Sequence, residues 1–165
     1  PSCNFLIKKD IFQEIGGFNT KFWPGEDTIL CLDVVHKFKK RILYDPAVLV
    51  YHHRRPLFKK HLGQVANYAR HRGYFLKRYA KNSLKPGYFF PSLILSGILA
   101  SLFLGIFFDH RFLNLILAYL VIALIFSIGQ NAKLSFLVFL GTILTHLTYG
   151  LYFLIGLFSK KLKEE

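Results

Sequence analysis

The sequence predicts an α/β domain followed by an all-α bundle of transmembrane helices. Charged residues are concentrated in residues 1–85, whereas only Asp109, Arg111 and Lys133 are charged across residues 90–158. A soluble domain interrupts its apolar segments with polar residues at every turn or every second residue, so the second stretch indicates a bilayer. The first stretch holds both strand-like and helix-like segments, which favours a mixed α/β fold there.

The first segments predict a strand and a short helix. Residues 3–8 have the composition of a strand, and Asp10 is placed to cap a helix over residues 11–15. Gly16-Gly17 ends that helix, because glycine enters the left-handed backbone conformation at low cost. A loop rich in turn-forming residues is expected over residues 18–25.

A second helix and two strands are expected next. The run Glu26-Asp27-Thr28 suits a helix start, where unpaired N–H groups and the helix dipole favour negative charge. Residues 42–44 and 47–52 then predict two strands joined by a turn at Asp45-Pro46. The second strand is apolar and β-branched enough to be buried.

A basic segment precedes the apolar half. Ten Lys and Arg residues and no acidic residue occur from Arg54 to Lys85, within a net charge of +13. Such a charge suits nucleic acid or a membrane, but its place next to an apolar segment favours the anionic cytoplasmic leaflet. Residues 57–80 predict an amphipathic helix, either in the membrane interface or packed on the soluble domain.

Three parts are therefore expected: residues 1–56, a basic interfacial helix within 57–85, and a transmembrane region over 86–165. The last contains three apolar helices, at about 89–108, 112–128 and 134–158. A helix crosses a ~30 Å hydrocarbon core in about 20 residues, so the second is near the short limit. Three crossings place Lys160, Lys161 and Lys163 on the side that disfavours positive charge. Either another crossing exists or one segment does not cross.

A polar patch interrupts the third apolar segment. His146 lies among Thr142, Thr145 and Thr148, all within one apolar stretch. Polar side chains at membrane depth either line a functional site or form hydrogen bonds between helices. Both interpretations stay open, and the second is the simpler.

Several linked motifs resemble the C-terminal half of the catalytic domain of family 2 glycosyltransferases, which have the Rossmann-like GT-A fold. They are Ile15-Gly16-Gly17-Phe18-Asn19, Gly25-Glu26-Asp27, Tyr44-Asp45-Pro46 and Tyr51-His52-His53-Arg54-Arg55, in the family's order and spacing. Membrane-bound bacterial members continue into a basic helix and C-terminal spans, as this chain does.

The resemblance implies a catalytic base. An inverting transferase removes a proton from an acceptor hydroxyl while that oxygen attacks the anomeric carbon of the donor sugar, and such base catalysis contributes about 10²–10⁴-fold. Asp27 matches the family's base, and Glu26 is expected to support it or to accept a hydrogen bond from the acceptor sugar. The alternative for both carboxylates is helix capping.

Five more residues are candidates for substrate binding. Trp23 either stacks against the acceptor sugar or anchors its loop in the core. At least one of His52, His53, Arg54 and Arg55 is expected to contact the nucleotide diphosphate, and His52 or His53 is a possible ligand of its metal. Arg54 and Arg55 alternatively begin the membrane-facing basic run.

The donor side is expected outside this sequence. The family binds its nucleotide-sugar and a divalent metal, Mg²⁺ or Mn²⁺, through an Asp-x-Asp motif that does not occur here. The chain begins at Pro1 and contains no Met, so we expect a preceding segment, and we expect these residues alone to be inactive. Cys3 and Cys31 predict neither a disulfide framework nor a zinc site.

The resemblance implies sugar transfer from a nucleotide-sugar to a lipid-linked or polysaccharide acceptor at the cytosolic face of the plasma membrane. The setting would be bacterial envelope or exopolysaccharide synthesis, with anionic lipids as partners and no nucleic acid. The alternative is a non-catalytic, basic membrane anchor or scaffold.

Overall fold

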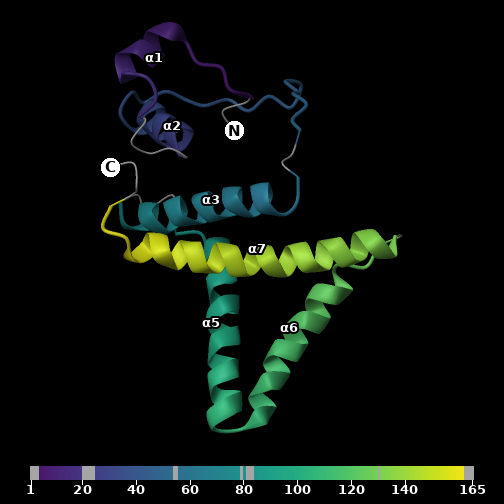
Figure 1. Cartoon of the computed structure of the whole chain (residues 1–165). Helices are drawn as coiled ribbons and strands as arrows, with labels where there is room; N and C mark the ends of the chain where they lie inside the picture. Colours follow the sequence, from purple (N-terminus) through teal and green to yellow (C-terminus); the bar gives the residue numbers. More distant parts are fainter. Residues whose placement is uncertain are drawn as a thin grey trace. The chain divides into compact units, whose positions relative to one another are not determined.

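The computed structural model of the chain describes residues 4–19, 25–53, 56–78, 80, 84–129 and 131–161. Every regular element in this part of the chain is a helix, so the predicted α/β fold is wrong and the described part is all-α (Figure 1). The described portion of the predicted strand 3–8 and the predicted strands 42–44 and 47–52 are irregular instead.

The physical reason is that these apolar runs have no strand beside them. Leu43, Tyr44 and Tyr51 are 87%, 90% and 95% exposed, although their composition suits a buried strand. A strand is stabilised by cross-strand pairs, and the described residues hold no second strand to supply them. The one local feature that persists is the predicted turn, in which Asp45 accepts the Ala47 N–H at 2.9 Å.

The chain folds as two compact units. The first comprises residues 1–55 and 161–165, and the second comprises residues 56–160. The first unit contains α1 (Lys9–Ile15) and α2 (Glu26–His36). The predicted short helix is confirmed as α1, but it begins at Lys9, so Asp10 lies in its first turn and is not its N-cap. It ends at Gly16, whose φ of 85° is the left-handed conformation that favours glycine. Ile29, Leu30 and Val34 of α2 form the buried apolar core of this unit.

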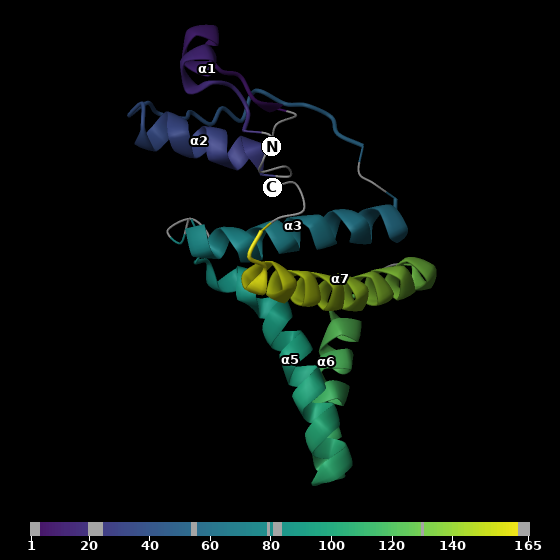
Figure 2. The ribbon, with the colours of Figure 1, turned by 60° about the vertical axis from the view of Figure 1, so that its left-hand side comes forward.

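The second unit is built on two helices that lie side by side, α3 (Lys59–Arg78) and α7 (Ala132–Phe158) (Figures 1 and 2). α3 confirms the helix expected over residues 57–80. The two backbones touch at glycines: a Cβ on Gly73 would overlap the Phe153 carbonyl, and one on Gly156 would overlap the Arg70 carbonyl. Small residues thus permit close contact between the helices, as in membrane helix pairs.

A helical hairpin leaves α7 crosswise, on the side away from α3 (Figures 1 and 2). Its arms are α5 (Pro86–Phe107) and α6 (Asn114–Ile125), joined by the 3-10 helix η3 (His110–Leu113). At the tip Leu113 fills the space beside Gly105. Asp109 begins the tip, where it accepts the Arg111 N–H at 2.9 Å and pairs with the Arg111 guanidinium at 2.6 Å.

Two helices are long and apolar enough to cross a membrane, Pro86–Phe107 and Ala132–Phe158. The apolar segment between them is divided into η3 and the 12-residue α6, so it is the shortest of the three. Length and composition therefore support two membrane-spanning helices and a third, shorter apolar helix.

Candidate functional site

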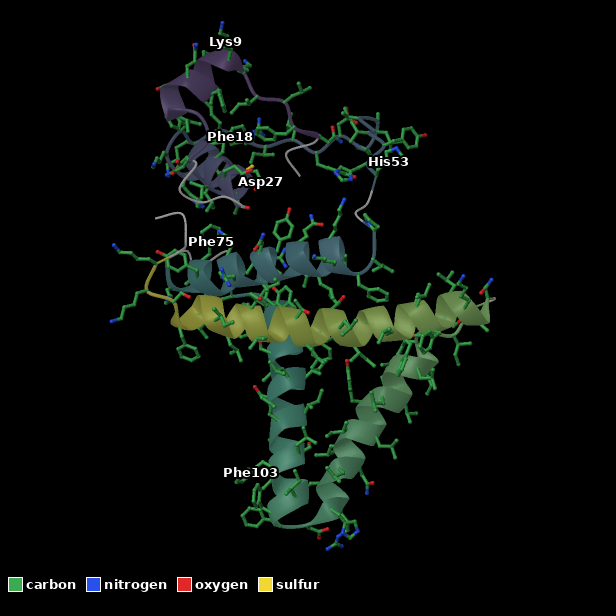
Figure 3. The ribbon with its side chains drawn as sticks, viewed as in Figure 1. Lys9, Phe18, Asp27, His53, Phe75 and Phe103 are labelled. Carbon is green, nitrogen blue, oxygen red and sulfur yellow. The ribbon has the colours of Figure 1, made fainter. Side chains whose placement is uncertain are left out.

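Glu26 and Asp27 lie in the first turn of α2 (Figure 3). Gly25 precedes them with a φ of 146°, a conformation that side-chain-bearing residues rarely adopt. Each carboxylate accepts a local backbone N–H: Glu26 Oε2 from Gly25 at 2.8 Å, and Asp27 Oδ1 from Thr28 at 2.7 Å. The predicted helix start is confirmed, and both carboxylates stabilise it.

The hydrogen bonds from Thr28 leave one oxygen of the Asp27 carboxylate available. Its Oδ1 accepts both the N–H and, at 3.3 Å, the hydroxyl of Thr28, whereas Oδ2 has no hydrogen-bond partner among the described residues. The residue is only half-buried. A carboxylate that is oriented by hydrogen bonds to one of its oxygens is suited to accept a proton from an incoming hydroxyl at the other. Capping and base catalysis are therefore compatible at this position.

A pocket of about 370 Å³ lies between the end of α1 and the body of α2. Asp33 and Lys37 line it and form an ion pair at 3.0 Å. Neither Glu26 nor Asp27 lines this pocket, so the hollow and the candidate base are separate features of α2. The sequence analysis did not predict the Asp33–Lys37 ion pair, although an acidic and a basic residue four positions apart on a helix indicate one.

The remaining predicted binding residues are not brought to Asp27 in the described structure. His52 and His53 lie on an exposed irregular segment, with His53 labelled in Figure 3. No hydrogen bond or ion pair connects either one with Glu26 or Asp27 within the ranges that the structure covers. Trp23, Arg54 and Arg55 lie outside the described residues.

The expected divalent metal has no ligand set here. Across the described ranges, no group of three or more His, Cys, Asp and Glu side chains is placed to hold a metal ion. His52 and His53 would supply imidazoles, which are a poor match to the oxygen ligands that Mg²⁺ prefers. These residues do not fit the metal, and no chemical step is assigned to it.

A second polar feature lies where α3, α5 and α7 meet, and we call it the tyrosine–cation layer. The Arg72 guanidinium lies 4.3 Å from the Tyr88 ring centre and donates to the Tyr149 hydroxyl at 3.4 Å, while Arg70 lies 5.2 Å from the Tyr152 ring centre. The layer consists of Arg70, Arg72, Tyr88, Tyr149 and Tyr152. The sequence indicated the arginines as part of the basic run but not the tyrosines, although Tyr88 lies at the start of an apolar segment, where tyrosine is a known interface signal.

The polar patch around His146 forms contacts between helices. His146 Nδ1 lies 3.1 Å from the Tyr119 hydroxyl of α6, and its ring lies edge-on to Phe90 of α5. Thr145, on a neighbouring side of α7, lies 3.3 Å from His61 Nε2 of α3. Of the two interpretations that the sequence left open, hydrogen bonding between helices is the one that these distances support.

Compared with known protein families, curated proteins and solved structures, the chain matches none.

Proposed function

We propose that this chain supplies the acceptor side of a membrane-bound, inverting glycosyltransferase. It would act on a nucleotide-sugar and a lipid-linked or polysaccharide acceptor. The observation that carries the proposal is the Asp27 carboxylate, with one oxygen fixed by Thr28 and the other without a partner in the described structure. The resemblance to family 2 glycosyltransferases gives this carboxylate its expected role.

In the proposed reaction, Asp27 takes the proton from an acceptor hydroxyl. The oxygen then attacks the anomeric carbon of the donor sugar, and the bond to the nucleotide diphosphate breaks on the opposite face. Because the carboxylate is already oriented by its capping hydrogen bond, little side-chain ordering is needed at the moment of transfer. Glu26 is one residue away and would accept a hydrogen bond from the acceptor sugar.

The membrane half serves this proposal by keeping the reaction at a lipid surface. α3 follows the first unit directly in sequence and carries Lys59, Lys60, Arg70, Arg72 and Lys77. Cations of this kind are attracted to anionic cytoplasmic lipids at about 1 kcal/mol each near the surface. We propose a multi-pass protein of the plasma membrane with its catalytic part in the cytoplasm, where an acceptor borne on lipid is within reach.

The test is sugar transfer in membranes. Membranes from cells that express the natural protein would be incubated with radiolabelled nucleotide-sugars, one at a time. We expect one of them to label a lipid-extractable or polysaccharide product that is absent from control membranes. If no sugar is transferred although the protein is present in the membrane at normal amounts, the proposal is wrong.

The second candidate function is a non-catalytic membrane anchor. It is favoured by the capping hydrogen bonds, which give both carboxylates a structural role without chemistry. The tyrosine–cation layer also suits an anchor, because both side-chain types bind at the membrane interface. An anchor predicts that Asp27→Asn leaves the natural protein's cellular function intact, whereas the transferase predicts its loss.

A further inference from the structure

We propose that α3 and α7 lie together in the plane of the membrane interface and that only the α5–η3–α6 hairpin crosses the bilayer. The partner in this proposal is an anionic lipid surface. The length of α7 alone suggests a crossing, so the inference depends on how the helices of the second unit pack. It does not rest on the proposed sugar transfer.

The contacts between α5 and α7 are confined to the first turns of α5. Phe89 lies with its ring edge-on to Phe153 at 5.3 Å, and Ser92 Oγ donates to the Gly150 carbonyl at 3.3 Å. Pro91 and Leu95 lie beside Gly150, and beyond them α5 continues to Phe107 in a direction away from α7 (Figure 1). Two helices that cross a bilayer side by side would touch along their length, whereas α5 touches α7 only where it leaves it.

The orientation of α7 relative to the membrane follows from the orientation of α5. In Figures 1 and 2, α5 extends away from α7 crosswise, while α3 follows α7 along its axis. A helix of 22 residues is about 33 Å long at 1.5 Å per residue, close to the ~30 Å hydrocarbon core, whereas the 12 residues of α6 are about 18 Å long, so the return arm also needs η3 and the residues after Ile125. If α5 spans that core, α7 lies parallel to the membrane surface.

Both ends of α5 carry interface markers. At its start the tyrosine–cation layer places Tyr88 against Arg72. Beyond its end lies the Asp109–Arg111 ion pair, with Arg111 80% exposed. Arginine and tyrosine are favoured at the headgroup level, and an exposed ion pair avoids the hydrocarbon. The polar groups therefore mark the two membrane surfaces at a separation that matches α5.

The outer surface of the hairpin and of α7 suits this placement. Phe103, Ile106 and Phe107 of α5 are 55%, 70% and 69% exposed, and Figure 3 shows Phe103 near the far end of that helix. On α7 four exposed apolar residues, Phe136, Leu151, Ile155 and Phe158, share one side at about 3.6 residues per turn, whereas Leu134 and Val138 are exposed on the other side near the start of the helix. That side lies roughly opposite Thr145, Tyr149, Tyr152 and Gly156, which contact α3.

Charge is distributed consistently with this topology. With two crossings, α3, Lys133 in the first turn of α7 and Lys160 after its end all lie on one side, and only the hairpin tip lies on the other. The positive-inside tendency is then satisfied, because the lysines and arginines of α3, Lys133 and Lys160 share the cytoplasmic surface, and Arg111 at the tip is paired with Asp109. The conflict that three crossings create at Lys160 disappears.

The experiment is cysteine labelling in sealed proteoliposomes of phosphatidylglycerol and phosphatidylethanolamine. Single-cysteine variants Lys133→Cys, Lys160→Cys and His110→Cys, in a Cys3→Ser/Cys31→Ser background, would be treated with a membrane-impermeant maleimide before and after permeabilisation. Within one population of oriented molecules, we expect Lys133→Cys and Lys160→Cys to be labelled from the same side and His110→Cys from the opposite side. Labelling of the two α7 ends from opposite sides overturns the in-plane placement. Labelling of all three from one side overturns the crossing hairpin.

A depth measurement keeps the proposal testable if one of those variants fails to insert. Phe136→Cys, Leu151→Cys and Phe158→Cys would carry a fluorophore, quenched by lipids with nitroxides at known depths. An in-plane α7 gives similar depths at the three positions. A crossing α7 separates Leu151 and Phe158 by about 10 Å at 1.5 Å per residue, and that result contradicts the proposal.

Discussion

The Cys31 thiol lies one helical turn after the Asp27 carboxylate on α2, and the two residues are coupled electrostatically. Burial raises the pKa of Cys31, and the negative charge of Asp27 raises it further. Both effects act in the same direction because each disfavours the charged thiolate. Cys31 is therefore sensitive to the charge at position 27.

Replacing Asp27 by Asn should lower the pKa of Cys31. The substitution removes the negative charge but keeps a side-chain oxygen that can accept the Thr28 N–H, so α2 should remain folded. In a Cys3→Ser background, the pH profile of alkylation by iodoacetamide should shift to lower pH. Asp10→Asn, which removes a carboxylate from the first turn of α1 instead, should leave the profile unchanged. Identical profiles for wild type and Asp27→Asn would show that Asp27 is not charged beside Cys31.

Gly156→Ala should separate α3 from α7. A methyl group there would overlap the Arg70 carbonyl, and forced overpacking typically costs about 1–3 kcal/mol. The control is Gly63→Ala on α3, where a methyl group meets no atom within 4 Å and helix propensity predicts a gain of about 0.5–1 kcal/mol. Thermal unfolding in detergent micelles measures both. Equal stability of the two variants would mean that α3 and α7 do not touch at Gly156.

Tyr119→Phe should weaken the contact between α6 and α7. It removes the hydroxyl that lies 3.1 Å from His146 Nδ1, and a hydrogen bond between membrane helices contributes about 0.6 kcal/mol on average. Tyr68→Phe is the matched control, because Tyr68 is 46% exposed on α3. Unfolding in micelles should show a small loss for the first variant alone. A larger loss of stability for Tyr68→Phe than for Tyr119→Phe would show that the Tyr119 hydroxyl does not stabilise the contact between α6 and α7.

Asp109 should titrate below its ordinary range. Hydrogen bonds from the Arg111 side chain and backbone, in that order, lower the pKa of Asp109. A carboxyl whose folded pKa is depressed contributes stability above its unfolded pKa of about 3.9, and loses that contribution as the pH falls through the folded value. Carboxyl NMR in micelles should therefore show a midpoint below about 3.9, and Arg111→Gln should raise it. An unchanged midpoint in Arg111→Gln would show that Arg111 does not lower the pKa of Asp109.

Local chemistry decided which parts of the fold were predictable. The start of α2 at Glu26 was predictable because its stabilising hydrogen bonds come from residues next to it in sequence. The strand expected over residues 47–52 was wrong because a strand depends on a partner from elsewhere in the chain. An apolar β-branched run does not reveal whether that partner is present, and Leu49 is 70% exposed.

The directions of the apolar helices could not be predicted, because they depend on how the helices pack against one another. The apolar segments were recognisable from hydropathy, but their directions were not. Gly150, Gly73 and Gly156 determine where α5 and α3 approach α7, and nothing in their sequence spacing shows which helix each glycine faces. In the candidate site, the place of Asp27 in the first turn of a helix was predictable, whereas the pocket beside the Asp33–Lys37 pair depends on how α1 packs near α2.

We propose that Asp27 acts as the base in sugar transfer. The most direct test measures label transfer from the nucleotide-sugar in membranes that contain wild-type natural protein, Asp27→Asn or the control Asp10→Asn at equal amounts. Loss of a general base typically costs about 10²–10⁴-fold in rate, so we predict at least a 100-fold loss for Asp27→Asn and wild-type transfer for Asp10→Asn. Transfer by Asp27→Asn at the wild-type rate, with the protein correctly inserted, would contradict the account.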